Sequence, residues 1–423
     1  MKFRKSGQVL LAAAATVVVG LGLTSCGASN TVDFLYVTSS KNNPGQINVY
    51  IVDSESGAAR QIADSPYPSG GRNPVADVAS PNGKNLYVAN HDDNTLVEFV
   101  IGTDGKLYPQ HTCNTPGTEP SAMAISPDGS LLYVVDFYQA GFTDVNPGPG
   151  ALAVYHIQSD GSLGNPITSS SGATTGDCNS IANGNLSYWP LGYYPGNVAA
   201  APNGSLVYVA DPNIFVTTVT PPTNGTVPIV PGLPGQIYGF TVGSGGTLGT
   251  VAGSPFTTAS GSEPLGVAVS PDNSGLFVTD TAQNQLLNYV IGAGGALSAN
   301  PSSPTTPTGT FPVGVVLSSD GSDLYVSNFT DGTVSEYTVS NGVPALNGSS
   351  STLAVGHSPT ALLIDPSLNE FLFTPNFVDG TISGARVNTT NGTLVNNQNS
   401  PYVTSGQPTS VAAIPHNQHA VSK

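Results

Sequence analysis

Apolar and polar positions alternate in short blocks along this chain. Residues 120–136 (PSAMAISPDGSLLYVVD) show the pattern, with two β-prone runs on either side of Ser126-Pro127-Asp128-Gly129. Proline presets φ at the second position of a tight turn, and glycine accepts the positive φ that follows. The block therefore predicts two short antiparallel strands joined by a turn.

The block recurs along the chain as P-x-x-V-A-x-S-P-D-G-x-x-L-Y-V-x-N, followed by a loop, an alternating strand and G-x-L. Six of the seven copies begin at a proline, and a seventh such proline opens the final fragment: Pro74, Pro120, Pro195, Pro264, Pro312, Pro359 and Pro408. Four of the intervals between these prolines are 46 to 49 residues, which fits a four-stranded repeat. No segment has a long apolar period of 3.6 residues, so the pattern predicts an all-β protein.

The two ends of the repeat array complement each other. The first copy, at 34–51, lacks its first strand, whereas residues 408–414 (PTSVAAI) match such a strand and nothing follows them. A C-terminal strand that completes the first unit closes a ring and leaves no unpaired inner edge. The sequence predicts a seven-bladed β-propeller at 33–414, closed by its C-terminal strand, with a tail at 415–423.

Two of the proline intervals are longer, at 75 and 69 residues, because of insertions at 137–150, 164–194 and 212–235. In a propeller, the loops between second and third strands emerge on the same face as the connections between blades. All three insertions are therefore expected over one sector of one face. We predict that any function lies on this face.

The N-terminus has the features of an export signal at 1–25. Basic residues precede an apolar run at 9–23, which ends in Leu23-Thr24-Ser25-Cys26. These four residues resemble the bacterial lipobox, and this resemblance implies acylation of Cys26 and a short tether at 26–32. We expect a lipoprotein of the cell envelope, at the outer membrane or periplasmic face, with an ordinary secretory signal as the alternative.

The chain is acidic, with 10 Lys+Arg against 26 Asp+Glu and a net charge of −16. Such a surface repels nucleic-acid backbones and disfavours anionic ligands. Contact with the membrane is expected through the lipid anchor alone. Cys113 and Cys178 can form a disulfide in an oxidising compartment, or remain two separate thiols.

A short polar residue ends the second strand of each repeat. Its oxygen atoms could form a ring around the channel that binds Ca²⁺ or a polar ligand. Alternatively, these side chains satisfy the backbone of the turn that follows. The residues are Ser39, Asn90, Asp136, Asp211, Asp280, Asn328 and Asn376. No other cofactor is evident.

The residues just before the repeat prolines differ between repeats, as those of a site would. Glu119 and Glu263 could act as acid and base, His357 as a general base, and Arg72 as the partner of an oxyanion. His91 could join them. The alternative is a set of solvated loop residues. The sequence contains no Ser/His/Asp order, H-E-x-x-H, Walker-type loop or C-x-x-C.

The insertions are rich in aromatic residues, which could form a platform for sugar faces or a partner protein, or could pack the loops on themselves. The aromatic residues are Phe137, Tyr138, Phe142, Tyr188, Trp189, Tyr193, Tyr194 and Phe215. Tyr188, Trp189 and Tyr194 are the ligand-binding candidates among them. Trp189, the only tryptophan, is the predicted probe of this surface.

With its repeats aligned, the chain resembles the seven-bladed lactonase-type propellers, which include 6-phosphogluconolactonase-like proteins and are related to Y-V-T-N repeat surface propellers. The resemblance lies in S-P-D-G-x-x-L-Y-V at 126–134, in Leu35-Tyr36-Val37-Thr38 and in the G-x-L blocks at 105–107, 161–163 and 392–394. It covers about 33–414 and implies the blade architecture and a possible lactonase activity. A phosphorylated lactone would need basic ligands, and only Arg72 is expected near the insertions.

Two functional hypotheses follow. The first is a binding scaffold that uses the insertion-bearing face to hold an envelope protein, a glycan or a small neutral ligand. The second is a hydrolase of a non-phosphorylated sugar lactone at the channel mouth. The aromatic insertions favour the first, whereas the whole-length resemblance and the rim residues favour the second.

Overall fold

A computed structural model describes residues 30–168, 178–179, 187–214, 233–348 and 351–416. The predicted signal peptide, Cys26, Phe215 and residues 417–423 lie outside the described residues. Within the described part, no helix has the length and apolar character needed to cross a membrane.

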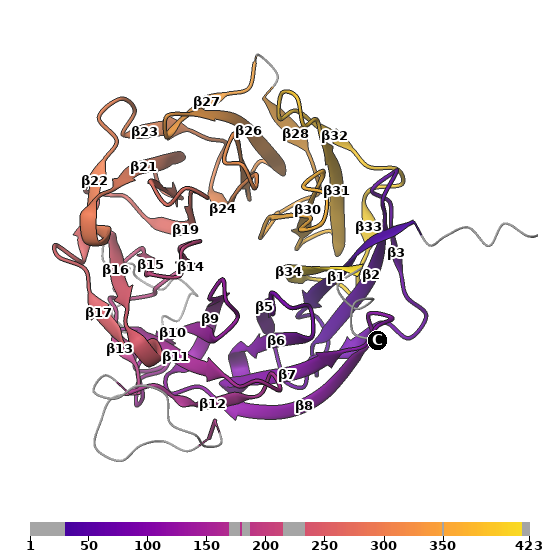
Figure 1. The fold of residues 1–423 in the computed structure, drawn as a ribbon, viewed down its shortest axis with the longest axis horizontal. Helices are drawn as coiled ribbons and strands as arrows, with labels where there is room; N and C mark the ends of the chain where they lie inside the picture. The colour runs from indigo at the N-terminus through magenta and orange to yellow at the C-terminus, as the bar shows by residue number, and fades with distance from the viewer. Residues whose placement is uncertain (1–29, 169–177, 180–186, 215–232, 349–350, 417–423) are drawn as a thin grey trace, which may run out of the picture. The chain divides into compact units, whose positions relative to one another are not determined.

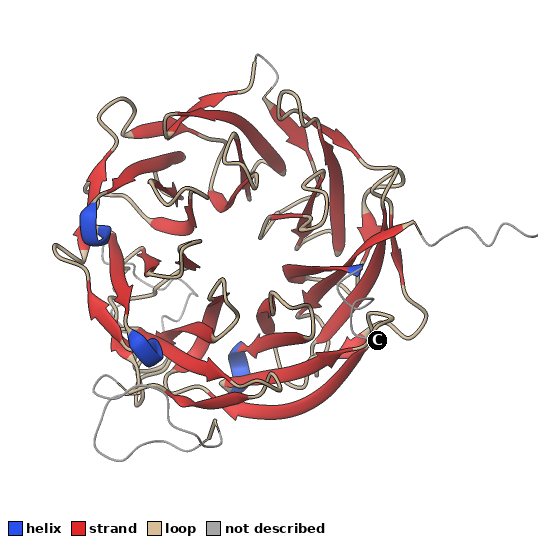
Figure 2. Ribbon diagram, viewed as in Figure 1, coloured by secondary structure: helices blue, strands red, loops and turns tan. Residues whose placement is uncertain are grey.

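The described residues form seven antiparallel sheets that follow one another around a ring (Figures 1 and 2). We number these blades 1 to 7 along the chain. The innermost strands, from blade 1 to blade 7, are β34 (Pro408–Pro415), β5 (Pro74–Ala79), β9 (Thr118–Ile125), β14 (Val198–Ala200), β19 (Pro264–Val269), β24 (Pro312–Leu317) and β29 (Leu363–Ile364). The second strands are β1 (Thr31–Ser39), β6 (Asn85–Asn90), β10 (Leu131–Tyr138), β15 (Leu206–Asp211), β20 (Gly275–Asp280), β25 (Asp323–Asn328) and β30 (Phe371–Asn376).

The outer half of each blade is built in the same order. The third strands are β2 (Gln46–Asp53), β7 (Thr95–Ile101), β11 (Ala151–Ile157), β16 (Gln236–Val242), β21 (Gln285–Ile291), β26 (Thr333–Ser340) and β31 (Thr381–Val387). The fourth strands are β3 (Ala59–Gln61), β8 (Leu107–Asn114), β12 (Leu163–Pro166), β17 (Leu248–Thr250), β22 (Leu297–Ala299), β27 (Val343–Leu346) and β32 (Leu394–Asn396). Except in blade 2, a short strand also pairs with the third strand: β4 (Tyr67–Pro68), β13 (Trp189–Pro190), β18 (Phe256–Thr257), β23 (Thr305–Pro307), β28 (Thr352–Ala354) and β33 (Tyr402–Val403). The short 3₁₀ turns are η1 (His91–Asp93), η2 (Ser244–Gly246) and η3 (Ala293–Gly295).

The C-terminal strand closes the ring, as predicted. Strand β34 pairs antiparallel with β1, with Ile414 opposite Phe34 and Val411 opposite Val37. Blade 1 therefore takes its inner strand from one end of the array and its other strands from the opposite end. The seven-bladed all-β propeller expected from the repeats is confirmed.

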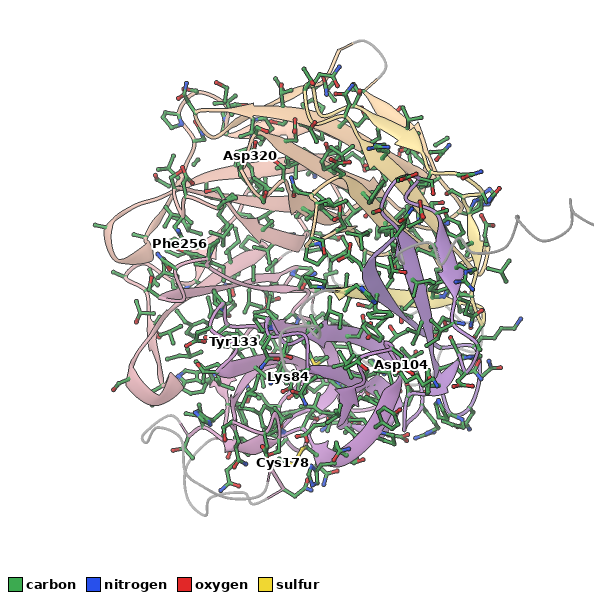
Figure 3. All side chains as sticks on the ribbon, turned by 45° about the vertical axis from the view of Figure 1, so that its right-hand side comes forward. Lys84, Asp104, Tyr133, Cys178, Phe256 and Asp320 are labelled. Carbon is green, nitrogen blue, oxygen red and sulfur yellow. A yellow bond between two sulfur atoms is a disulfide. The ribbon has the colours of Figure 1, made fainter. Side chains whose placement is uncertain are left out.

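Neighbouring blades pack face to face, and their side chains fill the space between the sheets (Figure 3). The cluster between blades 3 and 4, for example, combines Tyr133 and Leu152 with Val207 and Phe240. Because both faces of each sheet are covered, strands such as β6 are buried at every position. This two-sided burial explains why the L-Y-V blocks are continuous apolar runs rather than alternating ones.

The register of the inner strands shows which loops share a face. Pro120 pairs with Asp136, and Pro264 pairs with Asp280, so the inner strand starts where the second strand ends. The described parts of the insertions leave from this end of the blades, which we call the insertion-bearing face. A disulfide joins Cys113 of β8 to Cys178, which lies between β12 and β13 of blade 3 (Figure 3).

The two most regular sequence blocks meet across blade boundaries. In four blades, the L-Y-V tyrosine donates its hydroxyl hydrogen to the carbonyl of the G-x-L glycine in the next blade. These bonds are Tyr36 to Gly105 (3.2 Å), Tyr87 to Gly161 (2.7 Å), Tyr208 to Gly295 (2.7 Å) and Tyr325 to Gly392 (2.8 Å). Blades 5 and 7 have Phe277 and Phe373 at this position, which lack the hydroxyl group.

These positions require glycine for two reasons. Gly295 has φ of 87°, a left-handed value that side chains disfavour. A Cβ atom at Gly295 would also lie 2.5 Å from Leu206 Cδ2, inside the neighbouring blade. The preceding residue, Gly294, has φ of 69°, but a Cβ atom there would meet nothing within 4 Å.

A comparison of Gly294 with Gly295 allows the effect of backbone strain to be measured apart from that of interblade packing. Gly294→Ala and Gly295→Ala restrict the unfolded chain equally. We expect Gly294→Ala to lower the free energy of unfolding by ~1–2 kcal/mol from the left-handed conformation, and Gly295→Ala to lower it by a further ~1–3 kcal/mol from overpacking. Urea unfolding of the two variants measures the difference, and equal losses would contradict the packing argument.

Candidate functional site

A central cavity of about 520 Å³ is lined by residues of all seven blades. The inner strands form its wall. At the insertion-bearing face, side chains from the strand ends and connections surround it: Phe137, Tyr194, Pro212, Ile214, Glu263, Thr281 and Phe311. The cavity therefore occupies the position at which the sequence predicts a site.

The polar groups of the cavity are acidic or neutral. Asp77 and Glu263 are the acidic residues among those that line it, and no Lys, Arg or His of the described residues is among them. The hydroxyl-bearing residues are Ser121, Tyr194, Thr281, Thr360, Thr409 and Ser410. Such a lining can bind hydroxyl groups, but it offers no cation to a phosphate.

The seven polar strand ends do not form an open ring of ligands. Six of them, Asn90 to Asn376, are 0% exposed, and Ser39 is 1% exposed. Their oxygens accept hydrogen bonds from the connection that enters the same blade: Asn328 from the N–H of Gly309, Asn376 from that of Gly356 and Asp136 from that of Gly117. Asp211 and Asp280 accept from the N–H groups of Asn213 and Glu263. The alternative, in which these residues satisfy the local backbone, describes them correctly, and they offer no exposed Ca²⁺ ring.

The four predicted catalytic residues do not converge. Within the described residues, no hydrogen bond or ion pair links any two of Arg72, Glu119, Glu263 and His357. Arg72 Nε donates to Asp93 Oδ1 at 2.6 Å, and its backbone N–H donates to Asp93 Oδ2 at 2.7 Å.

His357 repeats the arrangement of Arg72 in blade 7. Its Nδ1 lies 2.8 Å from Asp379 Oδ1, and its N–H donates to Asp379 Oδ2 at 2.7 Å. The side chains of Arg72 and His357 are 52% and 81% exposed. Both side chains therefore brace turns and do not line the central cavity, and no contact within the described residues joins either of them to Glu119 or Glu263.

Glu119 instead approaches His91, the lesser candidate. His91 Nε2 lies 3.8 Å from Glu119 Oε2, while His91 Nδ1 lies 2.9 Å from Asp92 Oδ1. The His91 ring meets the edge of Phe137, which lines the cavity. Burial raises the pKa of the Glu119 carboxyl. This row of three polar side chains borders the cavity without lining it.

Glu263 is the rim carboxylate that does line the cavity. Its backbone N–H donates to Asp280 Oδ1 at 2.9 Å, which fixes the connection, and Thr281 Oγ1 donates to Glu263 Oε2 at 3.4 Å. The side chain is half-buried. Beside it, Thr281 also lines the cavity. Glu263 is therefore the predicted residue best placed to touch a ligand.

The three aromatic candidates lie in different surroundings. Tyr194 lines the cavity, and its hydroxyl oxygen accepts a hydrogen bond of 2.8 Å from Tyr138. Trp189 is 7% exposed, packs in the cluster between blades 3 and 4, and donates from Nε1 to the carbonyl of Leu248 at 3.0 Å. Tyr188 precedes it, is half-buried and does not line the cavity. The prediction that Trp189 is a probe of this surface was wrong, because the Trp189 side chain, which belongs to strand β13, packs in the core.

Asp77, in the middle of β5, was missed by the sequence analysis. It is 4% exposed and lines the cavity, and neither of its carboxylate oxygens has a hydrogen-bond partner within the described part of the chain. Burial raises the pKa of this carboxyl to about 7. The signal was available, because the other inner strands carry an apolar residue at the position of Asp77.

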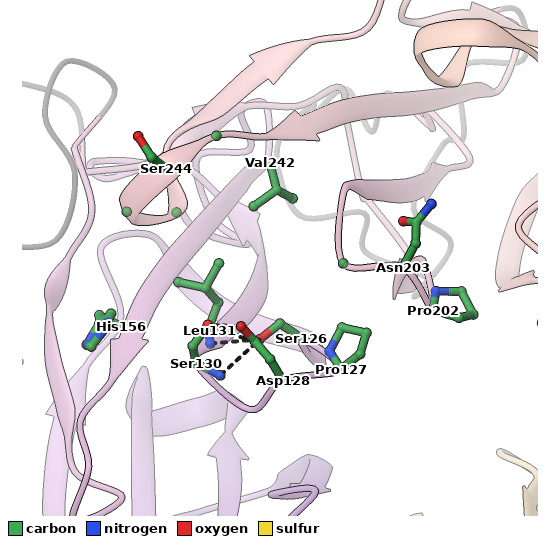
Figure 4. A pocket seen from close by; sticks show the side chains of 14 residues that line it. Ser126, Pro127, Asp128, Ser130, Leu131, His156, Pro202, Asn203, Val242 and Ser244 are labelled. Carbon is green, nitrogen blue, oxygen red and sulfur yellow. Dashed lines mark hydrogen bonds between the residues drawn. The ribbon is translucent and has the colours of Figure 1, made fainter.

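A second cavity, of about 510 Å³, lies at the hairpin turns on the opposite face (Figure 4). Its acidic residue, Asp128, accepts hydrogen bonds from Ser126 Oγ at 2.6 Å and the Ser130 N–H at 3.0 Å. These bonds hold the pKa of Asp128 below its ordinary value. Asp272 and Asp320 make the same bonds in blades 5 and 6, so this arrangement belongs to the repeated turn.

Comparison with known proteins identifies a family whose model matches this sequence. The model of the family described as lactonase, seven-bladed β-propeller, matches residues 28–139 and 235–413. The comparison with curated proteins gave no match.

Two solved structures illustrate the likeness of fold. A candidate 6-phosphogluconolactonase of Bacteroides fragilis is 17% identical, with a TM-score of 0.68 over 92% of this chain and 99% of that one. The periplasmic gluconolactonase of Pseudomonas aeruginosa is 18% identical, with a TM-score of 0.67 over 90% of this chain and 99% of that one. The family model covers more than half of the sequence, and the chain therefore belongs to the lactonase family of seven-bladed β-propellers.

Proposed function

We propose that the protein hydrolyses a neutral, hydroxyl-rich lactone in its central cavity. The observation that carries this proposal is a cavity lined by two carboxylates and several hydroxyl groups, with no basic side chain among its described residues. Family membership supports the reaction class. The absence of a cation for phosphate favours a non-phosphorylated substrate.

Lactone hydrolysis needs an activated water molecule and a donor to the tetrahedral oxyanion. In the proposed step, the Glu263 carboxylate takes a proton from water while the water oxygen adds to the acyl carbon. The bond from the acyl carbon to the ring oxygen then breaks, and the ring oxygen receives the proton from Glu263. The product is an open-chain hydroxy acid.

Tyr194 is suited to the donor role. Its oxygen accepts the hydrogen bond from Tyr138, so its own hydrogen is available to a ligand. Burial raises the pKa of Tyr138, which keeps that hydroxyl a donor. Once the product carboxylate has formed, the acidic lining repels it, and this repulsion favours product release.

The scaffold hypothesis has less support. It depended on the aromatic insertions as a surface platform, whereas Trp189 packs in the core. We propose that export, if the N-terminal signal acts as expected, places the reaction in the cell envelope. The family and the cavity chemistry lead us to put lactone hydrolysis first.

The substrate class can be tested with purified protein. We expect hydrolysis of D-glucono-δ-lactone above its spontaneous rate, followed by pH-stat at constant pH. The 6-phosphate of the same lactone should react with a lower kcat/KM, because the described lining of the cavity offers the phosphate two carboxylates and no cation. Failure to hydrolyse any sugar lactone would overturn the proposed function.

The role of Glu263 is tested by Glu263→Gln, which keeps the shape of the side chain and removes the base. We expect kcat to fall about 10²-fold or more. Glu370→Gln is the matched control, since Glu370 pairs with Arg386 Nη2 at 2.8 Å and does not line the cavity.

Glu119→Gln completes this comparison. Glu119 borders the cavity through His91 and Phe137, so we expect kcat to change by less than about tenfold, below the range of a general base. If Glu119→Gln abolished turnover and Glu263→Gln did not, the base would belong to the row that contains His91.

A further inference from the structure

The inner strands show one departure from their shared pattern. Counting from the first proline, the fourth residue is Asp77 in blade 2, and an apolar residue in every other blade: Met123, Val198, Val267, Val315, Leu362 and Val411. The fold therefore accepts an apolar side chain at this position. A carboxylate in its place needs a reason other than architecture.

The surroundings of Asp77 make the carboxylate costly. Both of its oxygens are shielded from solvent and lack a partner within the described residues. Its backbone N–H donates to Ser410 Oγ at 3.3 Å, and the nearby Ser410 hydroxyl offsets the effect of burial on the carboxyl only in part, so the pKa of Asp77 stays raised. A buried and unpartnered carboxylate is strongly unfavourable. Residues that destabilise a fold in this way are characteristic of functional positions.

The position of Asp77 indicates what it meets. It is three residues beyond Pro74, which starts the strand at the insertion-bearing face, so it lies roughly 10 Å below the rim. Asp77, Ser410 and Thr360 all line the cavity, and Thr360 Oγ1 also lacks a partner within the described residues. Thr360, the second residue counted from its repeat proline, lies nearer the rim, whereas Asp77, the fourth, places an acceptor without a hydrogen-bond partner among the described residues in the lower part of the cavity.

We propose that Asp77 anchors a sugar-binding subsite on the floor of the cavity, where its carboxylate accepts hydrogen bonds from two hydroxyl groups of a polyhydroxylated lactone. This inference rests on the proposed function for the identity of the ligand. Rotation about the two side-chain bonds of Asp77 brings its oxygens to the cavity surface that the residue already lines. The substrate then supplies the partners that the protein lacks.

The proposed subsite gives the rim and the lower part of the cavity different roles. Glu263 lies at the rim, where the acyl group would react, whereas Asp77 lies below it and would hold the rest of the ring. Asp77 is thus a specificity-determining residue rather than a catalytic base. The binding of a lactone without hydroxyl groups should therefore not depend on Asp77.

Two lactones with the same six-membered ring test this inference. In Asp77→Val and Asp77→Asn, we expect the KM for D-glucono-δ-lactone to rise at least tenfold for Val and less for Asn, with little change in kcat. The KM for δ-valerolactone, which lacks hydroxyl groups, should not change. Glu336→Gln is the control, since Glu336 is also a buried carboxylate but lies outside the cavity. Equal changes for both lactones, or none, would overturn the subsite.

Calorimetric titration with D-glucono-δ-lactam, which is not hydrolysed as a lactone, separates this inference from the proposed function. Binding that is at least tenfold weaker in Asp77→Val supports the subsite even if the protein hydrolyses no lactone. Lactone turnover together with unchanged lactam binding in that variant overturns the subsite alone. Binding of Ca²⁺ to the wild-type protein that Asp77→Asn abolishes would overturn it in favour of a cation site.

The pH dependence of stability provides a second measurement. A misfolded variant would not gain stability over the wild type. With a pKa of about 7 in the folded state against 3.8 as the ordinary value, Asp77 lowers stability as pH rises from 4 to 7 and lowers it by a constant amount above 7. The other titratable groups lining the cavity, Glu263 and Tyr194, are retained in the variant. We expect Asp77→Asn to have a higher urea midpoint than the wild type at pH 8, and the same midpoint at pH 4. A lower midpoint at pH 8 would mean that the carboxylate is structural.

Discussion

The hydrogen bond from a tyrosine of one blade to a glycine carbonyl of the next is the contact that the repeated sequence blocks build between blades. It ties the second strand that contains Tyr87 or Tyr325 to the outer hairpin of the neighbouring blade. The hydroxyl and carbonyl oxygens are 2.7–2.8 Å apart. The glycine must be present both for its left-handed backbone and for the space beside it. Within the described residues, four of the seven blade boundaries have this bond. The inner strands of all seven blades surround the cavity on the axis.

The fold could be predicted from the sequence because its determinants repeat, and each copy of the pattern is independent evidence for the same blade. The site could not, because the candidate residues before the repeat prolines lie in connections, where the two-residue alternation of a strand does not give the direction of a side chain. Arg72 and His357 precede inner strands as predicted candidates, yet each contacts an aspartate of its own blade and does not line the cavity. Trp189 belongs to an insertion, yet a short strand buries it. Asp77 was overlooked since it lies inside a block that is generic in the other blades.

Two groups of acidic residues in this protein have opposite surroundings. Those in the hairpin turns, such as Asp128 and Asp320, are surrounded by hydroxyl and N–H donors that hold their pKa below its ordinary value. Those along the strands, such as Asp77 and Asp211, are desolvated, and burial raises the pKa of each to about 7. Asp211 has a structural task, since one of its oxygens accepts the N–H of Asn213. Neither carboxylate oxygen of Asp77 accepts such a backbone hydrogen bond within the described residues, and this contrast supports a role for it in binding.

The closing strand has a consequence for the biosynthesis of the site. Thr409 and Ser410 belong to β34, which the ribosome makes after all the other described strands, and both line the cavity next to Asp77. The wall of the pocket is therefore incomplete until this segment has docked onto β1. Among the described strands, the last to be synthesised is thus the one that completes the wall of the central cavity.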